Sequence, residues 1–420
     1  MIEIKRWECT LLEKTENWLL VYGRRKTGKT FLLRKCVKWD TCLTVTKTGK
    51  TVVETGKEHR IMTTREAIKN VTKFLKEENT VVIDEVQRVP DSELRNLPTP
   101  DSKDNRRLIL CGTGLAAVNK VYSDKSPLKG HLTPIKIDLT AFEDAFAAFP
   151  HLQFREAAEW ATLARDPWIL GLIKPEGKAS EVIARNAEML ASSATGLLGE
   201  IFLEEGNPFN KYLDSMLRLL ADGYWSLKDI AAQLHQQGIT PSPDVESTKK
   251  ALDELTSIGL VDQIPVWSPN DAQTYYRHRS SLMALLLYVD ERYLSAGLRP
   301  TPSAVDARLS LEVQFGIAEV LAKWKNLRLT YRVNSKGYLD VVLASKQEPV
   351  IGYEVKKEPF TSNDARKAVK RIKQAGIPRV GLISLKERPP DIADENLGPA
   401  ELRNIIRLNA KKQRRQALSQ

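Results

Sequence analysis

The sequence lacks most features that would place it in a membrane, outside the cell or around a structural metal ion. Its 420 residues contain no apolar run approaching about eighteen residues, so we expect no membrane-spanning helix. Residues 1–6 lack the apolar core of a signal peptide. The few cysteines form neither a CxxC pair nor a metal-like cluster; they are Cys9, Cys36, Cys42 and Cys111. We therefore expect a cytoplasmic protein with reduced cysteines.

Positive charge is in excess. The chain has 64 Lys and Arg residues against 53 Asp and Glu, a net charge of +11, and 42% of its residues are hydrophobic. This is the composition of a globular chain, and its length exceeds one ordinary core, so we expect two or three domains. The charge suits a polyanion such as DNA, although some basic proteins are basic only for solubility.

Residues 23–30 match the phosphate-loop pattern GxxxxGK[ST] without a gap. An apolar run typical of a buried strand precedes them and a helical pattern follows, which argues against an ordinary Gly- and Lys-rich turn. The backbone N–H groups and the helix N-terminus would face a phosphate. Lys29 would reach the β- and γ-phosphates, and the Thr30 hydroxyl would bind Mg²⁺. The sequence therefore predicts an ATP and Mg²⁺ site formed by Gly23, Arg24, Arg25, Lys26, Thr27, Gly28, Lys29 and Thr30.

A second motif predicts hydrolysis. Residues 80–85 are an apolar β-branched run that ends in Asp84 and Glu85, as expected of a buried parallel strand. Asp84 would hold Mg²⁺ through its waters, and Glu85 would orient and deprotonate the attacking water. The alternative is a strand followed by a solvated turn. Thr113, after the next buried strand, would lie beside the nucleotide and sense the γ-phosphate.

The patterns predict an α/β chain of five segments. These are a phosphate-loop ATPase core (1–150), a helical lid (151–210), a winged helix (211–285), a nuclease-like domain (300–390) and a basic tail (391–420). The tail is expected to be disordered or loosely helical. In the winged helix, the third helix would present Ser247, Lys249 and Lys250 to the DNA major groove. Winged helices also serve as plain packing modules, and this alternative stays open.

Residues 311–383 follow the order helix, three strands, helix, strand. Asp340 lies within the second strand, and Glu354 and Lys356 end the third on one face. If the strands pair, Asp340 and Glu354 can share Mg²⁺, with Glu312 of the preceding helix completing the metal shell. Lys356 would polarise a water or stabilise charge on a scissile phosphate. The αβββαβ order and the D…ExK pattern resemble the restriction-endonuclease-like nucleases; the alternative is a strand whose charges face solvent.

Basic residues cluster around and after this motif. Such runs usually form a face exposed to solvent, and the more specific interpretation is that they bind nucleic acid. The first cluster contains Lys356, Lys357, Arg366, Lys367, Lys370, Arg371 and Lys373, and the second contains Lys411, Lys412, Arg414 and Arg415.

With these blocks placed, the chain resembles the archaeal ATPase family of phosphate-loop NTPases. The resemblance rests on residues 21–30, 83–87, 108–113 and 126–130. The family is similar to the signal-transducing branch of the AAA-like NTPases and typically adds a winged helix and a C-terminal nuclease-like domain. The sequence departs from it at His131, where the family has an arginine. Slow hydrolysis is one consequence, and the substitutes left open are Arg88, Arg106 and Arg107.

These observations predict a cytoplasmic, Mg²⁺-dependent ATPase that acts on DNA and carries a metal-dependent nuclease-like domain. One alternative is a nucleotide-dependent switch or scaffold with an inactive nuclease-like domain and protein partners. A second is a defence or mobile-element nuclease in which ATP hydrolysis gates cleavage. We expect no membrane partner, and self-association is left open.

Overall fold

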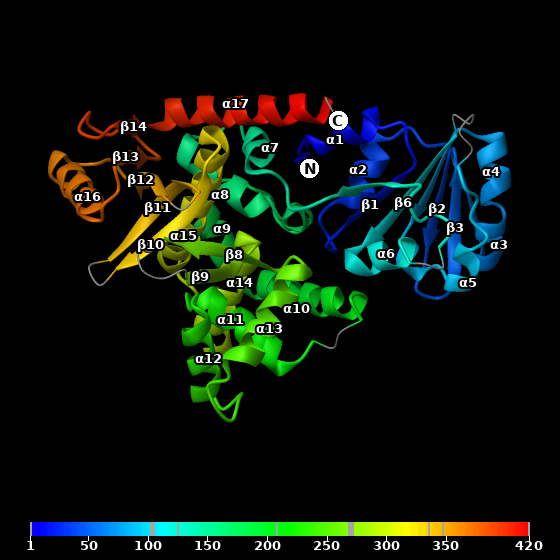
Figure 1. The fold of residues 1–420 in the computed structure, drawn as a ribbon, viewed down its shortest axis with the longest axis horizontal. Coiled ribbons are helices and arrows are strands. Elements are labelled where there is room, and N and C mark those ends of the chain that lie inside the picture. Colours follow the sequence, from blue (N-terminus) through cyan, green and yellow to red (C-terminus); the bar gives the residue numbers. More distant parts are fainter. Residues whose placement is uncertain are drawn as a thin grey trace. The chain divides into compact units, whose positions relative to one another are not determined.

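The protein was analysed as a computed structural model, which describes residues 2–100, 106–123, 126–206, 209–267, 273–334, 337–346 and 348–418. It contains two compact units, each with its own sheet of seven strands (Figure 1). The N-terminal unit comprises Trp7–Leu139, Leu197–Phe209 and Gln416–Gln420. The C-terminal unit comprises Met1–Arg6, Thr140–Gly196 and Asn210–Arg415. No helix in the described ranges is long and apolar enough to span a bilayer.

The sheet of the N-terminal unit has the strand order β4-β3-β2-β5-β6-β1-β7. Five neighbouring strands run parallel: β2 (Thr41–Val45), β5 (Thr80–Asp84), β6 (Arg107–Thr113), β1 (Leu19–Gly23) and β7 (Thr133–Lys136). The antiparallel strands β3 (Lys50–Thr55) and β4 (Glu58–Thr63) extend one edge. Parallel strands that are covered on both faces read as continuous apolar runs. This is why β1, β5 and β6 were recognisable in the sequence.

Helices cover both faces of this sheet. Successive residues of a strand alternate between faces, so Leu20 and Ile83 pack in one core cluster while Leu19 and Val82 pack in the other. The helices of this unit are α1 (Glu8–Lys14), α2 (Lys29–Cys36), α3 (Thr64–Lys69), α4 (Val71–Glu77), α5 (Asp91–Leu94) and α6 (Gly114–Val121), with a short 3-10 turn, η1 (Val86–Arg88). Since β1, β5 and β6 are parallel, the three sequence motifs that follow them meet at one edge of the sheet.

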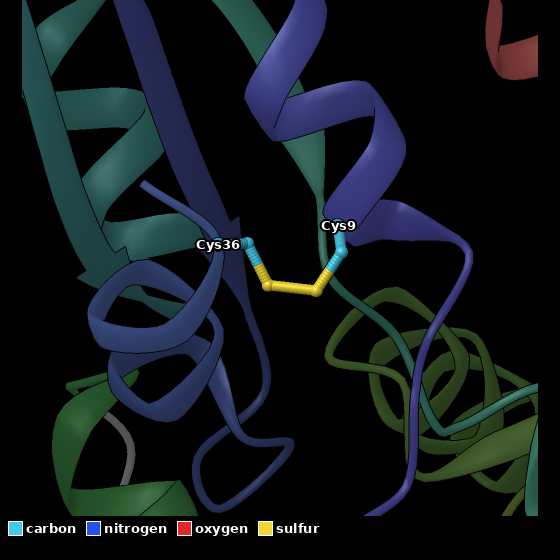
Figure 2. Close-up of a disulfide and its surroundings, with 2 residues drawn as sticks. All are labelled: Cys9 and Cys36. Atoms are coloured by element: carbon cyan, nitrogen blue, oxygen red, sulfur yellow. A yellow bond between two sulfur atoms is a disulfide. The ribbon is translucent and has the colours of Figure 1, made fainter. Parts of the chain in front are cut away.

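A disulfide links two helices of the N-terminal unit. Figure 2 shows Cys9 of α1 bonded to Cys36, the last residue of α2, and their Cα atoms lie 5.1 Å apart. The expectation of four reduced cysteines is therefore wrong for this pair. The pairing could not be seen in the sequence because only the packing of α1 on α2 brings together residues 27 positions apart. Cys42 and Cys111 are free and buried, and burial raises the pKa of Cys42 to about 11.

The C-terminal unit is built on a sheet of order β14-β13-β12-β11-β10-β8-β9. Its strands are β8 (Val261–Val266), β9 (Gln273–His278), β10 (Arg328–Asn334), β11 (Gly337–Ser345), β12 (Glu348–Lys356), β13 (Arg379–Ser384) and β14 (Glu395–Leu397). The helical segment expected at 151–210 contains α8 (Phe154–Ala164), α9 (Ala179–Arg185) and α10 (Ala187–Glu204), after α7 (Phe142–Ala147). Residues of α10 up to Gly196 belong to this unit, and those from Leu197 belong to the N-terminal unit.

The elements expected of a winged helix are present in order: α11 (Lys211–Asp222), α12 (Leu227–Gln236), α13 (Val245–Ser257), β8 and β9. Ser226 and Asp244 cap α12 and α13, accepting hydrogen bonds from Asp229 N and Ser247 N. The β8–β9 hairpin is not a separate body, because β8 also bridges β10 through Val266 and Tyr331. The predicted segments 211–285 and 300–390 therefore share one sheet. Residues 268–271, which would form the tip of a wing between these two strands, lie outside the described residues.

The element order predicted for residues 311–383 is also observed. After α14 (Ser281–Arg292), α15 (Pro302–Lys325) is followed by β10, β11, β12, α16 (Ser362–Gln374) and β13. Strands β11 and β12 are antiparallel, and their register pairs Val341 with Tyr353. Strand β13 runs parallel to β12 on its other side.

Of the two forms expected for the basic tail at 391–420, disordered or loosely helical, the structure shows the helical one and contradicts disorder. This segment holds β14 and a helix, α17 (Pro399–Leu418). Leu402, Ile405 and Ile406 are buried, and Asn409 donates hydrogen bonds to Val320 O and Glu143 Oε1. The buried positions follow the helical i, i+3, i+4, i+7 spacing. The spacing was present in the sequence, but the basic residues between these positions obscured it.

Candidate nucleotide site

Two glycines shape the loop between β1 and α2. Gly28 precedes α2 with a φ of +92°, in the left-handed region that favours glycine. A Cβ on Gly23 would lie 2.0 Å from the carbonyl oxygen of Ile137, so no larger residue fits there. Thr27 ties the loop together by donating to Arg24 O at 2.9 Å, and Lys26 has a φ of +63°. The loop therefore leads directly into the N-terminus of α2, which can face an anion.

Lys29, the first residue of α2, is directed back to this loop. Its Nζ atom donates to the carbonyl oxygens of Gly23 and Arg24, both at 2.9 Å. The side chain is buried, and burial lowers the pKa of Lys29, while the nearby acids Asp84 and Glu85 oppose this. The ammonium group is thus held beside the loop, where a phosphate could accept hydrogen bonds from it.

The strand β5 brings its acids to the same place. Thr30 Oγ1 donates to Asp84 Oδ2 at 2.7 Å, and the backbone N–H of Glu85 donates to Asp84 Oδ1 at 2.9 Å. A hydroxyl and a carboxylate are the hard oxygen ligands that Mg²⁺ prefers. Among the residues that the structure describes, no three His, Cys, Asp or Glu side chains form a metal cluster. This donor set fits an ion that keeps most of its ligands as water and phosphate oxygens.

Glu85 is held by its neighbours in η1. Its backbone adopts a left-handed φ of +62°, a conformation that costs roughly 1–3 kcal/mol for a non-glycine residue and is common at functional sites. Gln87 Nε2 donates to Glu85 Oε2 at 2.6 Å, and an Arg88 nitrogen lies 3.3 Å from the same oxygen. Gln87 Oε1 accepts from the backbone N–H of Thr113 at 3.2 Å. Gln87 thereby links Glu85, the acid that follows β5, to Thr113, the residue that ends β6.

Thr113 ends β6 at the edge of the sheet that carries the phosphate loop, and its role beside a nucleotide stays a prediction. Strand β6 pairs with β1 and with β5, and its register places Thr113 opposite Gly23. The residue is buried at the start of α6. The role of Gln87 was not predicted, since it depends on a strand pairing that the sequence does not display.

Two arginines also face this site. Arg25 of the loop donates to Glu200 and to Glu204, each at 2.5 Å. Arg88 donates to Val45 O at 3.1 Å and to Glu204 at 3.3 Å. Arg106 and Arg107, the other substitutes considered for the missing arginine, precede or begin β6, at the opposite end of that strand from Thr113. The structure therefore brings only Arg88, of these three, beside Glu85.

The predicted metal site of the C-terminal unit is not assembled among the described side chains. Glu312 is buried in α15 and pairs with Arg308 at 2.6 Å. Glu354 pairs with Arg371 of α16, and Lys356 lies 3.1 Å from Asp364. The register places the backbone of Asp340 next to the Val341–Tyr353 pair, across from Glu354, but its side chain lies outside the described part of the chain.

Comparisons with known proteins agree with the geometry of the N-terminal unit. Residues 15–139 match a family model described as "AAA domain". A search of curated proteins found no match.

Three solved structures illustrate the structural matches. The Aeropyrum pernix ORC2 protein, solved as ADPNP–ADP complexes, is 13% identical with a TM-score of 0.37, covering 74% of this chain and 94% of that chain. The Aeropyrum pernix ORC1 protein in complex with DNA is 12% identical with a TM-score of 0.31, covering 71% and 96%. CDC6p from Pyrobaculum aerophilum is 12% identical with a TM-score of 0.26, covering 66% and 89%. TM-scores of this size do not show a common fold over the aligned length.

Proposed function

We propose that the N-terminal unit binds ATP with Mg²⁺ and hydrolyses it. The observation that carries this proposal is the convergence of Lys29, the Thr30–Asp84 pair and Glu85 at one edge of a parallel sheet. The match of residues 15–139 to the AAA-domain model supports the same chemistry.

Each residue has a distinct part in the reaction. The N–H groups at the start of α2 and the Lys29 ammonium bind the phosphates. Thr30 and Asp84 would hold Mg²⁺, which would neutralise phosphate charge. Glu85 orients the attacking water and takes its proton. Its Oε2 atom accepts from Gln87, whereas its Oε1 atom lies 4.0 Å from an Arg25 nitrogen, beyond hydrogen-bond distance, and is the oxygen that would accept from the water. Arg88 stands beside Glu85 as the cation that can offset charge in the transition state.

Two substitutions test this proposal. Lys29→Ala removes the ammonium from the phosphate cradle, so ATP binding and turnover should both fall. Glu85→Gln keeps the shape but removes the base, so binding should persist while turnover drops by roughly a hundredfold or more. Isothermal titration with ATP and a phosphate-release assay measure the two properties separately.

Lys35→Ala is the matched control, since Lys35 is an exposed cation on the same helix, α2. It should leave both properties unchanged. Hydrolysis by Glu85→Gln at the parent rate would show that another group activates the water.

For the C-terminal unit we propose DNA binding through α16 and metal-dependent phosphodiester cleavage by Asp340, Glu354 and Lys356. The support is the αβββαβ element order and the exposed basic face of α16, formed by Arg366, Lys367, Lys370 and Lys373. Cations along one helix face suit a phosphate backbone. In α13, Ser247, Lys249 and Lys250 are exposed as a DNA reader requires, although Lys250 pairs with Glu246 at 2.8 Å.

A second candidate function is a nucleotide-dependent switch whose nuclease-like domain is inactive. The observation that favours it is the engagement of the carboxylates by arginines, Glu312 by Arg308 and Glu354 by Arg371. Each of these ion pairs occupies a carboxylate oxygen that could otherwise bind a metal ion. A cleavage assay with Mg²⁺ or Mn²⁺ separates the two candidates.

A further inference from the structure

Three glutamates at the end of α10 and in the turn after it lie against the nucleotide site. Glu200 accepts from Arg25 Nε, and Glu204 accepts from both Arg25 and Arg88. Glu205 accepts from the backbone N–H of Leu115, in the first turn of α6, at 3.1 Å. All of these residues belong to the N-terminal unit. The segment thus contacts the loop, the turn that follows β5 and the helix that follows β6.

The contacts of Glu204 are largely shielded from water. Its side chain is 11% exposed, and those of Arg25 and Arg88 are 19% and 20% exposed. Glu204 Oε2 is a buried atom without a hydrogen-bond partner. Burial also raises the pKa of the nearby Glu205 carboxyl, because burial disfavours its charged form. Partly buried ion pairs of this kind are screened less by salt than surface pairs.

The charges make this arrangement sensitive to an added anion. Asp84 and Glu85 already stand at the site, so the glutamates of the segment raise its local negative charge. A nucleoside triphosphate would bring several more negative charges to this site. Its terminal phosphate and the Glu204 carboxylate would then compete for hydrogen bonds from the guanidinium groups of Arg25 and Arg88, because a guanidinium group can donate to a phosphate or to a carboxylate.

We propose that residues 197–205 form an internal anionic segment that competes with the terminal phosphate of the nucleotide for Arg25 and Arg88. ATP binding and release of this segment are then linked, because each anion lowers the affinity of the two arginines for the other anion. The inference rests on the proposed function, since it describes the regulation of the same site. It assigns Glu204 as the principal competitor and Glu200 as its support, roles that no motif in the sequence indicates.

The first test measures ATP affinity. In the double variant Glu200→Gln and Glu204→Gln the amide groups keep the shape and lose the charge. This variant should bind ATP about tenfold more tightly than the parent, with a smaller gain for ADP, which lacks the terminal phosphate. Glu188→Gln is the matched control, because Glu188 lies in the first turn of the same helix, away from these arginines. Its ATP affinity should equal that of the parent.

The second test needs no substitution at the segment. Hydrogen exchange of residues 197–206 should speed up when ATP is added to the parent, and should stay unchanged when ATP is added to Lys29→Ala. Exchange that slows on ATP addition would overturn the inference.

The outcomes separate this inference from the proposed function. If the parent and the double variant bind ATP equally, or the double variant binds it more weakly, while Lys29→Ala weakens binding, competition is wrong and the nucleotide site stands. If the parent binds no ATP, the proposed function itself fails.

Discussion

At the scale of single residues, Gln87 stands out because it joins two strand ends that the proposed ATP hydrolysis needs. It donates to Glu85 and accepts from the N–H of Thr113. We predict that Gln87→Ala lowers the ATP turnover number by roughly tenfold or more and leaves ATP affinity unchanged, since the base loses its orientation but the phosphate cradle remains. Steady-state phosphate release and equilibrium titration measure the two quantities. Equal losses in both would indicate a loop that has lost its fold.

A second residue gives stability a pH dependence. His278 is buried and its Nε2–H donates to Leu217 O at 2.7 Å, and burial lowers the pKa of His278 to about 4. Arg277, Arg308 and Glu312 are the charged groups near it. An unfolded histidine binds its proton near pH 6.5, so between these values the unfolded state holds more protons. The stabilisation from neutral His278 is therefore complete above about pH 6.5 and lost as pH falls towards 4.

Urea unfolding at pH 7 and pH 5 measures this effect. The parent should lose about 2 kcal/mol from this group over that interval, and His278→Asn should lose correspondingly less. An equal loss in both proteins would place the pH dependence elsewhere.

Single residues also show which parts of the candidate site could be predicted from the sequence. Lys29, Thr30, Asp84 and Glu85 lie together because contiguous motifs at the ends of parallel strands must meet at one edge, and their roles toward a nucleotide stay predictions. The contacts of Glu204 with Arg25 and Arg88 could not be predicted. They join residues more than a hundred positions apart, and glutamate and arginine are too common for their positions to form a pattern.

At the scale of elements, α16 is the best described candidate for contact with nucleic acid. Ala365, Ala368 and Ile372 are buried against the sheet, which leaves the lysines on the solvent side. We predict that replacing Lys367, Lys370 and Lys373 with glutamine weakens DNA binding. The slope of log K against log salt should fall by roughly one unit for each phosphate that the helix no longer neutralises. Arg371 is kept in this variant because it pairs with Glu354.

Fluorescence anisotropy with duplex and single-stranded DNA at several salt concentrations measures this slope. The control replaces Lys411 and Lys412, exposed cations on α17, and should change affinity less. An unchanged slope in the α16 variant would favour the switch with protein partners.

Elements were easier to predict than their associations. The helices and strands from α15 to β13 follow the predicted order, because their apolar spacing switches clearly between the periods of a helix and a strand, although α15 begins at Pro302 and not at residue 311. The joining of β8 to β10 was missed, since a single bridge between Val266 and Tyr331 has no local signal. The same holds for the packing of α17, which depends on the partners Val320 and Glu143.

At the scale of the whole molecule, the two units carry separate candidate chemistries on separate sheets. We predict that Asp340→Ala and Lys356→Ala abolish DNA cleavage and leave ATP hydrolysis largely intact, because neither residue belongs to the N-terminal unit. Cleavage of single-stranded, duplex and branched DNA with Mg²⁺ or Mn²⁺, with ATP or a non-hydrolysable analogue, provides the assay. Failure of the parent to cut any DNA or RNA substrate with either metal would establish the inactive nuclease-like domain.

The Cys9–Cys36 disulfide has a consequence for the continuity of the chain. Together with the backbone it closes a covalent ring that encloses β1, the whole phosphate loop and α2. A ring of this size restricts the unfolded chain by an amount worth about 3–4 kcal/mol in the chain-entropy description. It also means that a protease that cuts once inside the phosphate loop cannot separate the two pieces. The nicked protein would migrate as one band until a reductant opens the ring, and would then release its N-terminal fragment.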